Sequence, residues 1–425
     1  MSILRNSILT ITGRVTAFVL FAANGIVVAR LLGPTARGEY ALLILTANFS
    51  AILLTFGLGT SSAYFISQKK IAASTLLSFA LCFGVLLGTL AVLVFWRLDE
   101  TIIATWFPGV SNAHLRLCAF AIPGILLCNF LLGITQGLER FVLYNLTNAL
   151  RPLAALLCFL TLWYIGMRDV QPALWAYILG FTLASAVLFI ALASSRNDEM
   201  FLNSQKLKLL FGYGWKVYLA EISSYLFYRV DLFLIGYFLD TTQAGYYALA
   251  AFFAEGMWLL AGSIGTVLLP AAGSRNAEQM RTLVPRAVRM IVLLTGLSLF
   301  ALFLFDEAVI TVVVGEDYLP ALAPLRYSYL GILAMSLIKV IAAYALSLDQ
   351  AQFNTRVTLV GLCSNFLLNL WLIPKLGIVG AALATSSSYV LMAFCYLVWL
   401  RRRTQTPLFA MLRPRVEDWK FLNAR

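Results

Sequence analysis

Ionisable side chains inside long apolar stretches are the residues of this 425-residue chain best suited to chemistry. The candidates are Arg14, Arg151, Glu221, Arg229, Asp231 and Lys339. A charged group near the centre of a bilayer costs about 2.5–3.5 kcal/mol on insertion scales, so such groups are expected to face protein or water. A guanidinium group binds two phosphate oxygens at once through its fork. The excess of cations therefore favours an anionic ligand.

The segment 211–237 concentrates polar residues on one side of a predicted helix. At about 100° per residue, one stripe is formed by Tyr218, Glu221, Tyr225 and Arg229. Asp231 points away from this stripe. The tyrosine hydroxyls and ring faces would suit a sugar-bearing ligand, but ordinary packing explains them equally well.

Two interpretations of these charges stay open. In the first, they form structural ion pairs, Glu221 with Arg14 or Arg229 with Asp231. In the second, they line a central aqueous cavity that attracts an anionic substrate, and Glu221 or Asp231 carries a coupling ion.

Arg151 and Lys339 either line the same cavity or extend toward a membrane interface. The chain has one histidine and six cysteines without a CxxC pair, and it lacks GxxxxGK[ST]. We therefore expect no metal site, no cofactor and no nucleotide-driven motor.

Composition assigns the chain to the membrane. Hydrophobic residues make up 61% and charged residues 12%, against about 45–50% and 25% in soluble domains. This excludes a soluble enzyme, a disordered protein and a nucleic-acid-binding protein. The net charge of +12 is interpreted as loop lysines and arginines of a membrane protein.

The apolar stretches predict twelve transmembrane helices of about 20 residues each. They cover 8–29, 40–66, 72–96, 114–136, 144–166, 172–195, 211–237, 243–272, 287–305, 322–347, 355–373 and 377–400. No small-residue cleavage site follows the first stretch, so we expect a retained span rather than a signal peptide.

The distribution of cations predicts the topology and the domains. Most of the 31 lysines and arginines fall on one side when both termini are placed in the cytoplasm, as the positive-inside rule requires. The predicted parts are an N-lobe (1–195), a cytoplasmic linker (196–210), a C-lobe (211–400) and a basic tail (401–425). The tail is expected to form a short interfacial helix on anionic lipid, or else a docking site for a partner.

The two predicted lobes resemble each other weakly. LLGPTARGEYAL at 31–42 aligns with FLDTTQAGYYAL at 238–249, an offset of 207 residues. The same offset pairs Arg14 with Glu221, Asn24 with Asp231, and Asn48 with Glu255. Because each half has an even number of spans, the halves are parallel repeats with a cavity between the lobes.

These stretches carry a resemblance to a known family. The residues that carry it are Leu32-Gly33-Pro34 and the aligned stretch around Gly245. In these residues the chain resembles Wzx-type O-antigen or exopolysaccharide repeat-unit flippases. These belong to the polysaccharide transporters of the MOP superfamily. The resemblance implies an all-α membrane protein with twelve helices in two parallel six-helix lobes around a central cavity, of the MATE-like type. Arg14, Glu221 and Arg229 fit its charged positions.

The same resemblance implies the function. Such a protein is not an enzyme; it moves an undecaprenyl-diphosphate-linked oligosaccharide from the cytoplasmic to the outer leaflet of the bacterial inner membrane. The implied partners are this lipid-linked substrate, membrane lipids and the polysaccharide polymerase or chain-length machinery, with no nucleic acid and a monomeric state. The cavity arginines of the lipid II flippases are not clearly matched, and spans 13 and 14 are lacking.

Two other functions are alternatives to the flippase. A MATE-type multidrug or cation antiporter would need an acidic cavity, and cations outnumber acids in these spans. A membrane-embedded glycosyltransferase would need carboxylates on a sizeable extramembrane loop. The acids of 97–113 and 306–321 do not form an acid/base pair in a cleft.

Overall fold

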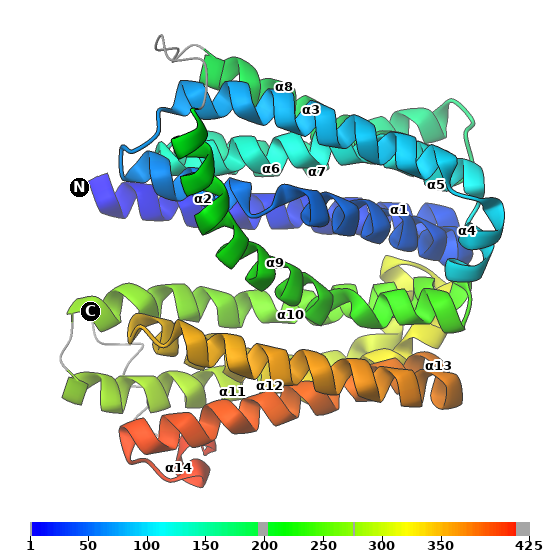
Figure 1. The fold of residues 1–425 in the computed structure, drawn as a ribbon. Coiled ribbons are helices and arrows are strands. Elements are labelled where there is room, and N and C mark those ends of the chain that lie inside the picture. Colours follow the sequence, from blue (N-terminus) through cyan, green and yellow to red (C-terminus); the bar gives the residue numbers. More distant parts are fainter. Residues whose placement is uncertain (1, 194–202, 275–276, 414–425) are drawn as a thin grey trace. The chain divides into compact units, whose positions relative to one another are not determined.

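A computed structural model describes the backbone of residues 2–193, 203–274 and 277–413, and it leaves the side chains of 2–12, 14, 259–274 and 277 outside the description. Within these ranges every regular element is helical (Figure 1). In chain order the elements are α1 (Ser2–Thr55), α2 (Leu58–Ser67), α3 (Ala73–Arg97), α4 (Glu100–Trp106), α5 (Asn112–Ala119), α6 (Ala121–Gly137), α7 (Phe141–Tyr164), α8 (Gln171–Ala193), α9 (Ser204–Phe238), α10 (Thr241–Ser274), α11 (Ala277–Val313), the 3-10 helix η1 (Glu316–Ala321), α12 (Leu322–Ser347), α13 (Ala351–Thr404) and α14 (Leu408–Leu412).

Two helices are nearly twice as long as one membrane crossing. α1 and α13 each contain 54 residues, or about 80 Å at 1.5 Å per residue, whereas a bilayer with its headgroups is about 40–45 Å thick. Their backbones break at Gly33 (φ 75°) and Gly377 (φ 60°). Both glycines lie at junctions that the sequence predicted between neighbouring spans. α13 contains the predicted spans 355–373 and 377–400. α1 contains 8–29 and only the first part of 40–66, whose remainder forms α2 after a break at Gly57.

Eight helices of the described residues are long and apolar enough to cross a membrane. α9 is not among them, since it carries Lys216, Glu221, Arg229 and Asp231. α10, whose second half has no described side chains, is not among them either. The predicted helical, multi-pass membrane class is confirmed, whereas the count of twelve spans stays a prediction.

The chain forms two compact units. Unit 1 comprises Met1–Tyr225 and Asp240–Gly245, and unit 2 comprises Leu226–Leu239 and Tyr246–Arg425. The boundary therefore falls inside α9 rather than in the predicted linker 196–210, of which 196–202 lies outside the described residues. The predicted division into lobes stays a prediction.

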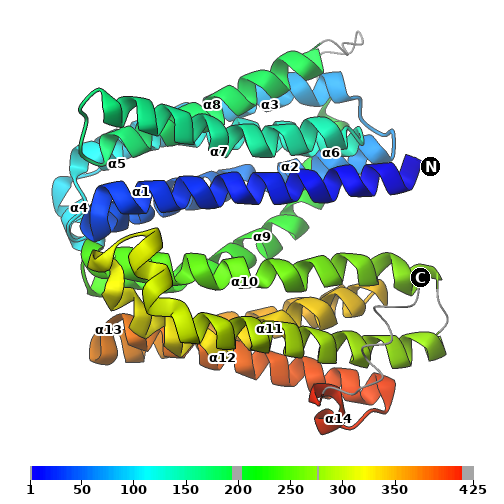
Figure 2. The same ribbon diagram turned by 180° about the vertical axis from the view of Figure 1, so that it is seen from behind.

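Unit 1 is a bundle of long helices. α7 packs along α8 and α1, and α6 packs against α2, α3 and α8, as both views show (Figures 1 and 2). Its core contains fully buried apolar side chains such as Leu126, Leu131 and Phe159. Large apolar side chains such as Leu86 and Leu93 are exposed, which is expected where a helix faces lipid rather than water.

The kink of α1 touches the first turn of α10, and both segments belong to unit 1. The hydroxyls of Thr35 and Thr242 are 2.8 Å apart, and these residues are separated by 207 positions, the offset of the predicted repeat. A Cβ on Gly38 would overlap the carbonyl oxygen of Thr241, and one on Gly245 would overlap the backbone of the kink. Equivalent residues of a repeat can touch each other only near their symmetry axis.

Unit 2 is built on α11, α12 and α13. α12 packs along α13 and α11, and the core contains Val288 and Ile291 of α11 and Ile341 of α12, all fully buried. α14 folds back onto this core through Met411, while Arg289 donates to the carbonyl of Ala410 at 3.3 Å. The first part of the predicted basic tail therefore docks on unit 2. Residues 414–425 lie outside the described residues.

Candidate functional site

Arg229 on α9 forms an ion pair with Glu255 on α10, inside unit 2. Its Nη1 donates to Glu255 Oε1 at 2.6 Å, and its Nη2 donates to Oε2 at 3.3 Å. About one third of each side chain is exposed, 34% for Arg229 and 33% for Glu255. The alternative pairing of Arg229 with Asp231 is therefore wrong. The charge of Arg229 is instead balanced by a carboxylate on the next helix.

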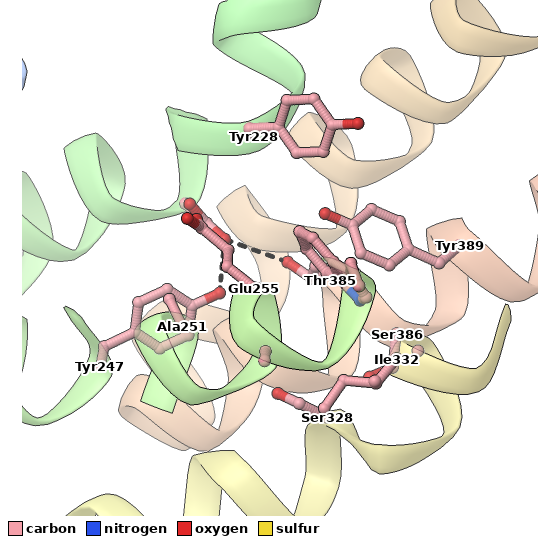
Figure 3. Close-up of a pocket in the computed structure, with 13 residues that line it drawn as sticks. Tyr228, Tyr247, Ala251, Glu255, Ser328, Ile332, Thr385, Ser386 and Tyr389 are labelled. Atoms are coloured by element: carbon pink, nitrogen blue, oxygen red, sulfur yellow. Dashed lines mark hydrogen bonds between the residues drawn. The ribbon is translucent and has the colours of Figure 1, made fainter. Parts of the chain in front are cut away.

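Asp231 lies nearby on α9 but is buried, with 7% of its surface exposed. Its carboxylate accepts hydrogen bonds from the hydroxyl of Tyr247, from Thr385 Oγ1 at 3.3 Å, and from the backbone amide of Leu232 at 2.7 Å. Figure 3 shows Tyr247 of α10 and Thr385 of α13, each with a dashed line for its hydrogen bond. These donors are all neutral. The positive charge of Arg229 on the same helix also acts on this carboxylate, and a proton or a bound cation would further offset its desolvation.

A row of side chains on α13 extends from the same carboxylate. Asn365 Nδ2 donates to Thr385 Oγ1 at 3.0 Å, and Asn369 Nδ2 donates to Asn365 Oδ1 at 2.9 Å. Asn369 Oδ1 is buried and has no hydrogen-bond partner in the described part of the chain. Amide and hydroxyl oxygens therefore lie along one path that starts at Asp231.

A small cavity is lined by residues that include Asp231 and Glu255 (Figure 3). Its volume is about 30 Å³, and one water molecule needs about 10–15 Å³ on this scale. The lining includes Tyr228 and Tyr389 together with the hydroxyls of Ser328 and Ser386. The cavity can hold water molecules or a small ion, but it is too small for a sugar ring.

Lys339 on α12 lies above two aromatic rings of the same unit. Its Nζ is 5.8 Å from the centre of the Tyr228 ring and 5.6 Å from that of Trp258. Cation–π contacts of this kind stabilise an ammonium group out of bulk water by about 0.5–2 kcal/mol. Lys339 therefore lies beside two residues, Tyr228 and Trp258, that line the unit 2 cavity described above, and its role stays a prediction.

The other residues of the predicted stripe face α1 and α2 within unit 1. The Tyr218 hydroxyl donates to the carbonyl of Leu53 at 2.8 Å, and the Tyr225 hydroxyl donates to that of Leu45 at 3.0 Å. These tyrosines therefore bind backbone groups of α1. Their predicted role in sugar binding stays a prediction.

Glu221 accepts a hydrogen bond from Thr60 Oγ1 at 2.8 Å. Thr60 belongs to the first turn of α2, which begins after a break at Gly57 (φ 67°). A helix N-terminus stabilises a carboxylate through its free amide groups and its dipole. The side chain of Arg14 lies outside the described residues, so its pairing with Glu221 stays a prediction.

Arg151 occupies the middle of α7 in unit 1. Its guanidinium carbon lies 4.7 Å from the centre of the Phe181 ring. Arg151 and Arg229 belong to different units, and within unit 2 Arg229 and Lys339 both lie near Glu255.

Sequence reasoning did not place Glu255, Thr385, Asn365 or Asn369 in the site. The repeat did provide a signal for one of them, because Glu255 is equivalent to Asn48 and Asp231 to Asn24. Asn365 and Asn369 are spaced by four residues, which puts two amides on one helix face. That spacing is a second signal that could have been used.

Comparison with known proteins assigns the chain to a family. Residues 27–323 match the family described as polysaccharide biosynthesis protein. A curated relative, the probable low-salt glycan biosynthesis flippase Agl15 of Haloferax volcanii, is 23% identical over 225 residues. That match covers 52% of this chain and 47% of the relative, so the chain spans about half of the relative's length.

Solved structures show the same fold. The lipid II flippase MurJ in an inward closed conformation aligns with a TM-score of 0.76 and 17% identity, covering 95% of this chain and 89% of that chain. An inward-facing multidrug resistance MATE family transporter aligns with a TM-score of 0.71 and 16% identity, covering 92% of this chain and 94% of that chain. The chain has the predicted MATE-like helical membrane fold, and it belongs to the family of polysaccharide biosynthesis proteins.

Proposed function

We propose that this protein is a flippase that moves an undecaprenyl-diphosphate-linked oligosaccharide repeat unit from the cytoplasmic to the outer leaflet of the bacterial inner membrane. Such transport would serve O-antigen or exopolysaccharide synthesis. The observation that carries the proposal is the family match over residues 27–323 in a chain whose helices can cross a membrane. The name of the curated relative, a flippase of glycan biosynthesis, supports the same activity.

In this proposal the protein changes no covalent bond. Cations of the membrane-spanning helices hold the diphosphate, polar and aromatic groups meet the sugars, and the polyprenyl tail stays in lipid. The two lobes open alternately to the two sides of the membrane, and both termini lie in the cytoplasm. A polymerase or chain-length machinery consumes the product outside, and the protein works as a monomer.

Asp231 is the stronger of the two candidates for ion coupling. Its carboxylate has only neutral hydrogen-bond donors and borders a cavity of about 30 Å³. Protonation, or binding of a small monovalent cation, would offset the desolvation of this carboxylate. Glu221 accepts a hydrogen bond from Thr60 near the start of α2 and is the second candidate.

Reconstitution of the purified full chain into liposomes tests the activity. The probe is an undecaprenyl-diphosphate-linked oligosaccharide with a fluorophore on the sugar, and a membrane-impermeant quencher reports the outer leaflet. We expect the protein to raise the quenchable fraction faster than protein-free liposomes do, and to leave ethidium uptake unchanged.

The alternative is a MATE-type cation antiporter, which the carboxylates of Asp231 and Glu255 beside the cavity favour. Proteoliposomes that accumulate ethidium along an ion gradient but leave the labelled lipid in its leaflet would assign this function and exclude the flippase.

A further inference from the structure

One end of unit 2 is formed by segments of α11, α13 and α14. The short helix α14 packs against α11 and α13 (Figures 1 and 2). Met411 of α14 is buried in the core of the unit, and Arg289 of α11 donates to the carbonyl of Ala410. The first turn of α13 lies at the same end as its last turns, because the Tyr396 hydroxyl donates to Asn354 Oδ1 at 3.0 Å. The described part of the predicted basic tail is therefore fixed to this end of the unit.

Exposed arginines gather at this end. They are Arg281 of α11, Arg356, Arg401, Arg402 and Arg403 of α13, and Arg413, which follows α14. The exposed acids of the same described segments are Glu278 and, in the turn before α13, Asp349. Because the cations outnumber the acids, the described part of this surface is positively charged and suits an anionic partner.

Two of these arginines approach one another from different helices. The charges of Arg281 and Arg403 both act on Tyr344 of α12, so both guanidinium groups lie near one side chain. The guanidinium carbon of Arg403 also lies 5.7 Å from the centre of the Trp399 ring. In the part of the chain that the structure describes, neither arginine has a carboxylate at ion-pair distance. Two like charges repel each other, and an anion bound between them would remove this repulsion.

An aromatic layer lies next to the arginines. The ring of Trp399 stacks on that of Phe353 with the centres 5.2 Å apart, and it contacts the ring of Tyr344 at 5.9 Å. Tryptophan and tyrosine are enriched where a membrane protein passes the lipid headgroups. Arg403 follows Trp399 by about one turn of α13. This end of unit 2 is therefore expected at the depth of the headgroups.

α14 adds an exposed apolar face to the same surface. Phe409 is 74% exposed, and Leu412 is exposed as well, whereas Met411 between them is fully buried. An exposed phenylalanine is unfavourable in water and favourable among the upper parts of acyl chains. Apolar side chains that alternate with arginines are typical of a segment that lies in the plane of an anionic membrane surface.

We propose that this end of unit 2, with Arg281, Arg403 and α14, binds the headgroups of anionic phospholipids. Arg281 and Arg403 contact a headgroup phosphate through their planar guanidinium groups, and Phe409 inserts among the acyl chains. The lipid is a component of the surrounding membrane and not the transported molecule. The inference therefore goes beyond the proposed function, and it holds for a flippase and for a cation antiporter alike.

The first test measures lipid binding to the purified full-length protein in detergent by native mass spectrometry. The probes are phosphatidylglycerol and phosphatidylcholine with the same acyl chains, and we expect wild type to prefer phosphatidylglycerol. Each arginine near an anionic lipid contributes about fivefold, so the double variant Arg281→Gln with Arg403→Gln should weaken phosphatidylglycerol binding about 30-fold. Binding of phosphatidylcholine should stay the same, and an excess of inorganic phosphate should not displace the lipid.

The matched control is the double variant Arg97→Gln with Arg168→Gln. It removes the same charge from two exposed arginines of unit 1, and it should leave phosphatidylglycerol binding nearly unchanged. The melting temperature without added lipid separates a folding defect from a lost contact.

The second test locates α14 in wild-type surroundings. A polarity-sensitive fluorophore is attached at Phe409→Cys in a background in which the six native cysteines are replaced, and the protein is placed in phosphatidylglycerol nanodiscs. Phospholipids with a quencher near the top of the acyl chain should quench this fluorophore. Leu86→Cys is the reference, because Leu86 is an exposed apolar residue of the membrane-spanning helix α3. This readout decides the proposal even where the double arginine variant does not fold.

Four outcomes overturn the inference. Wild type could bind both phospholipids equally. The control variant could lose as much affinity as the Arg281 and Arg403 variant, which would make the effect one of total charge. Inorganic phosphate could displace the lipid, which would make the position a site for free anions. The fluorophore at position 409 could stay in water and unquenched, in which case the surface would suit an acidic protein partner instead of lipid.

Discussion

Adding one methyl group where α1 meets α10 should shift the protein away from the conformation described here. In that contact a Cβ on Gly38 would overlap the backbone carbonyl oxygen of Thr241, which cannot move without displacing a helix. Overpacking of this kind costs about 1–3 kcal/mol. If transport requires the contact to form and separate, the cost falls only on the conformation in which it is formed. Gly38→Ala should then reduce the population of that conformation about 5- to 150-fold.

A disulfide between Thr35→Cys and Thr242→Cys reports this population. The two hydroxyl oxygens are 2.8 Å apart, so cysteines there can be bridged with little movement. The assay uses a background in which the six native cysteines are replaced, and it follows the rate of cross-linking under a mild oxidant. We expect fast cross-linking and loss of lipid flipping, with recovery on reduction, and we expect Gly38→Ala to slow the cross-linking.

Gly296→Ala is the control, because a Cβ at that position in α11 would meet no atom within 4 Å. The reasoning is refuted if Gly38→Ala cross-links and flips lipid at the rates of Gly296→Ala. It is also refuted if the cross-linked protein transports at the normal rate, because the contact would then stay closed throughout transport.

Three further expectations concern the ionisable groups. Arg229→Gln should lower the free energy of unfolding by about 1–3 kcal/mol because Glu255 loses its partner. The double variant with Glu255→Gln should recover the melting temperature. If it does not, the ion pair is not the reason for the lost stability. Asp231→Asn should abolish any effect of a proton or sodium gradient on flipping in liposomes while downhill flipping continues, and an unchanged gradient response would remove Asp231 from coupling. Glu221→Gln should reduce flipping more than Thr60→Val does, because the second variant removes only the hydrogen bond and keeps the charge; equal effects would reduce Glu221 to a structural role.

Periodicity correctly predicted one face of α9, and turn-forming residues marked the breaks between spans. The 3.6-residue repeat places Tyr218, Glu221 and Tyr225 on one face, and in the structure all three contact α1 or α2. The glycines at 33 and 377 lie at predicted junctions, since a positive φ and a nearby proline interrupt a helix wherever they occur.

Partner choice could not be predicted in the same way. Arg229 pairs with Glu255, 26 positions along the chain, although Asp231 is nearer in sequence. On a helix, residues two positions apart point in different directions, so the packing of α10 against α9 decides the pairing. The tyrosine hydroxyls present a similar limit, because the same residue type suits a sugar or a backbone carbonyl, and only the position of α1 distinguishes them.

The different charges of the two repeats have an energetic consequence for binding. Burying a charged side chain in a membrane protein costs about 2.5–3.5 kcal/mol. Unit 2 offsets this cost for Arg229 with its own carboxylate, so a ligand there would have to compete with Glu255. Unit 1 has the amide Asn48 at the position equivalent to Glu255. An anionic ligand would therefore meet a competing carboxylate at this position in unit 2 and an uncharged amide at the equivalent position in unit 1.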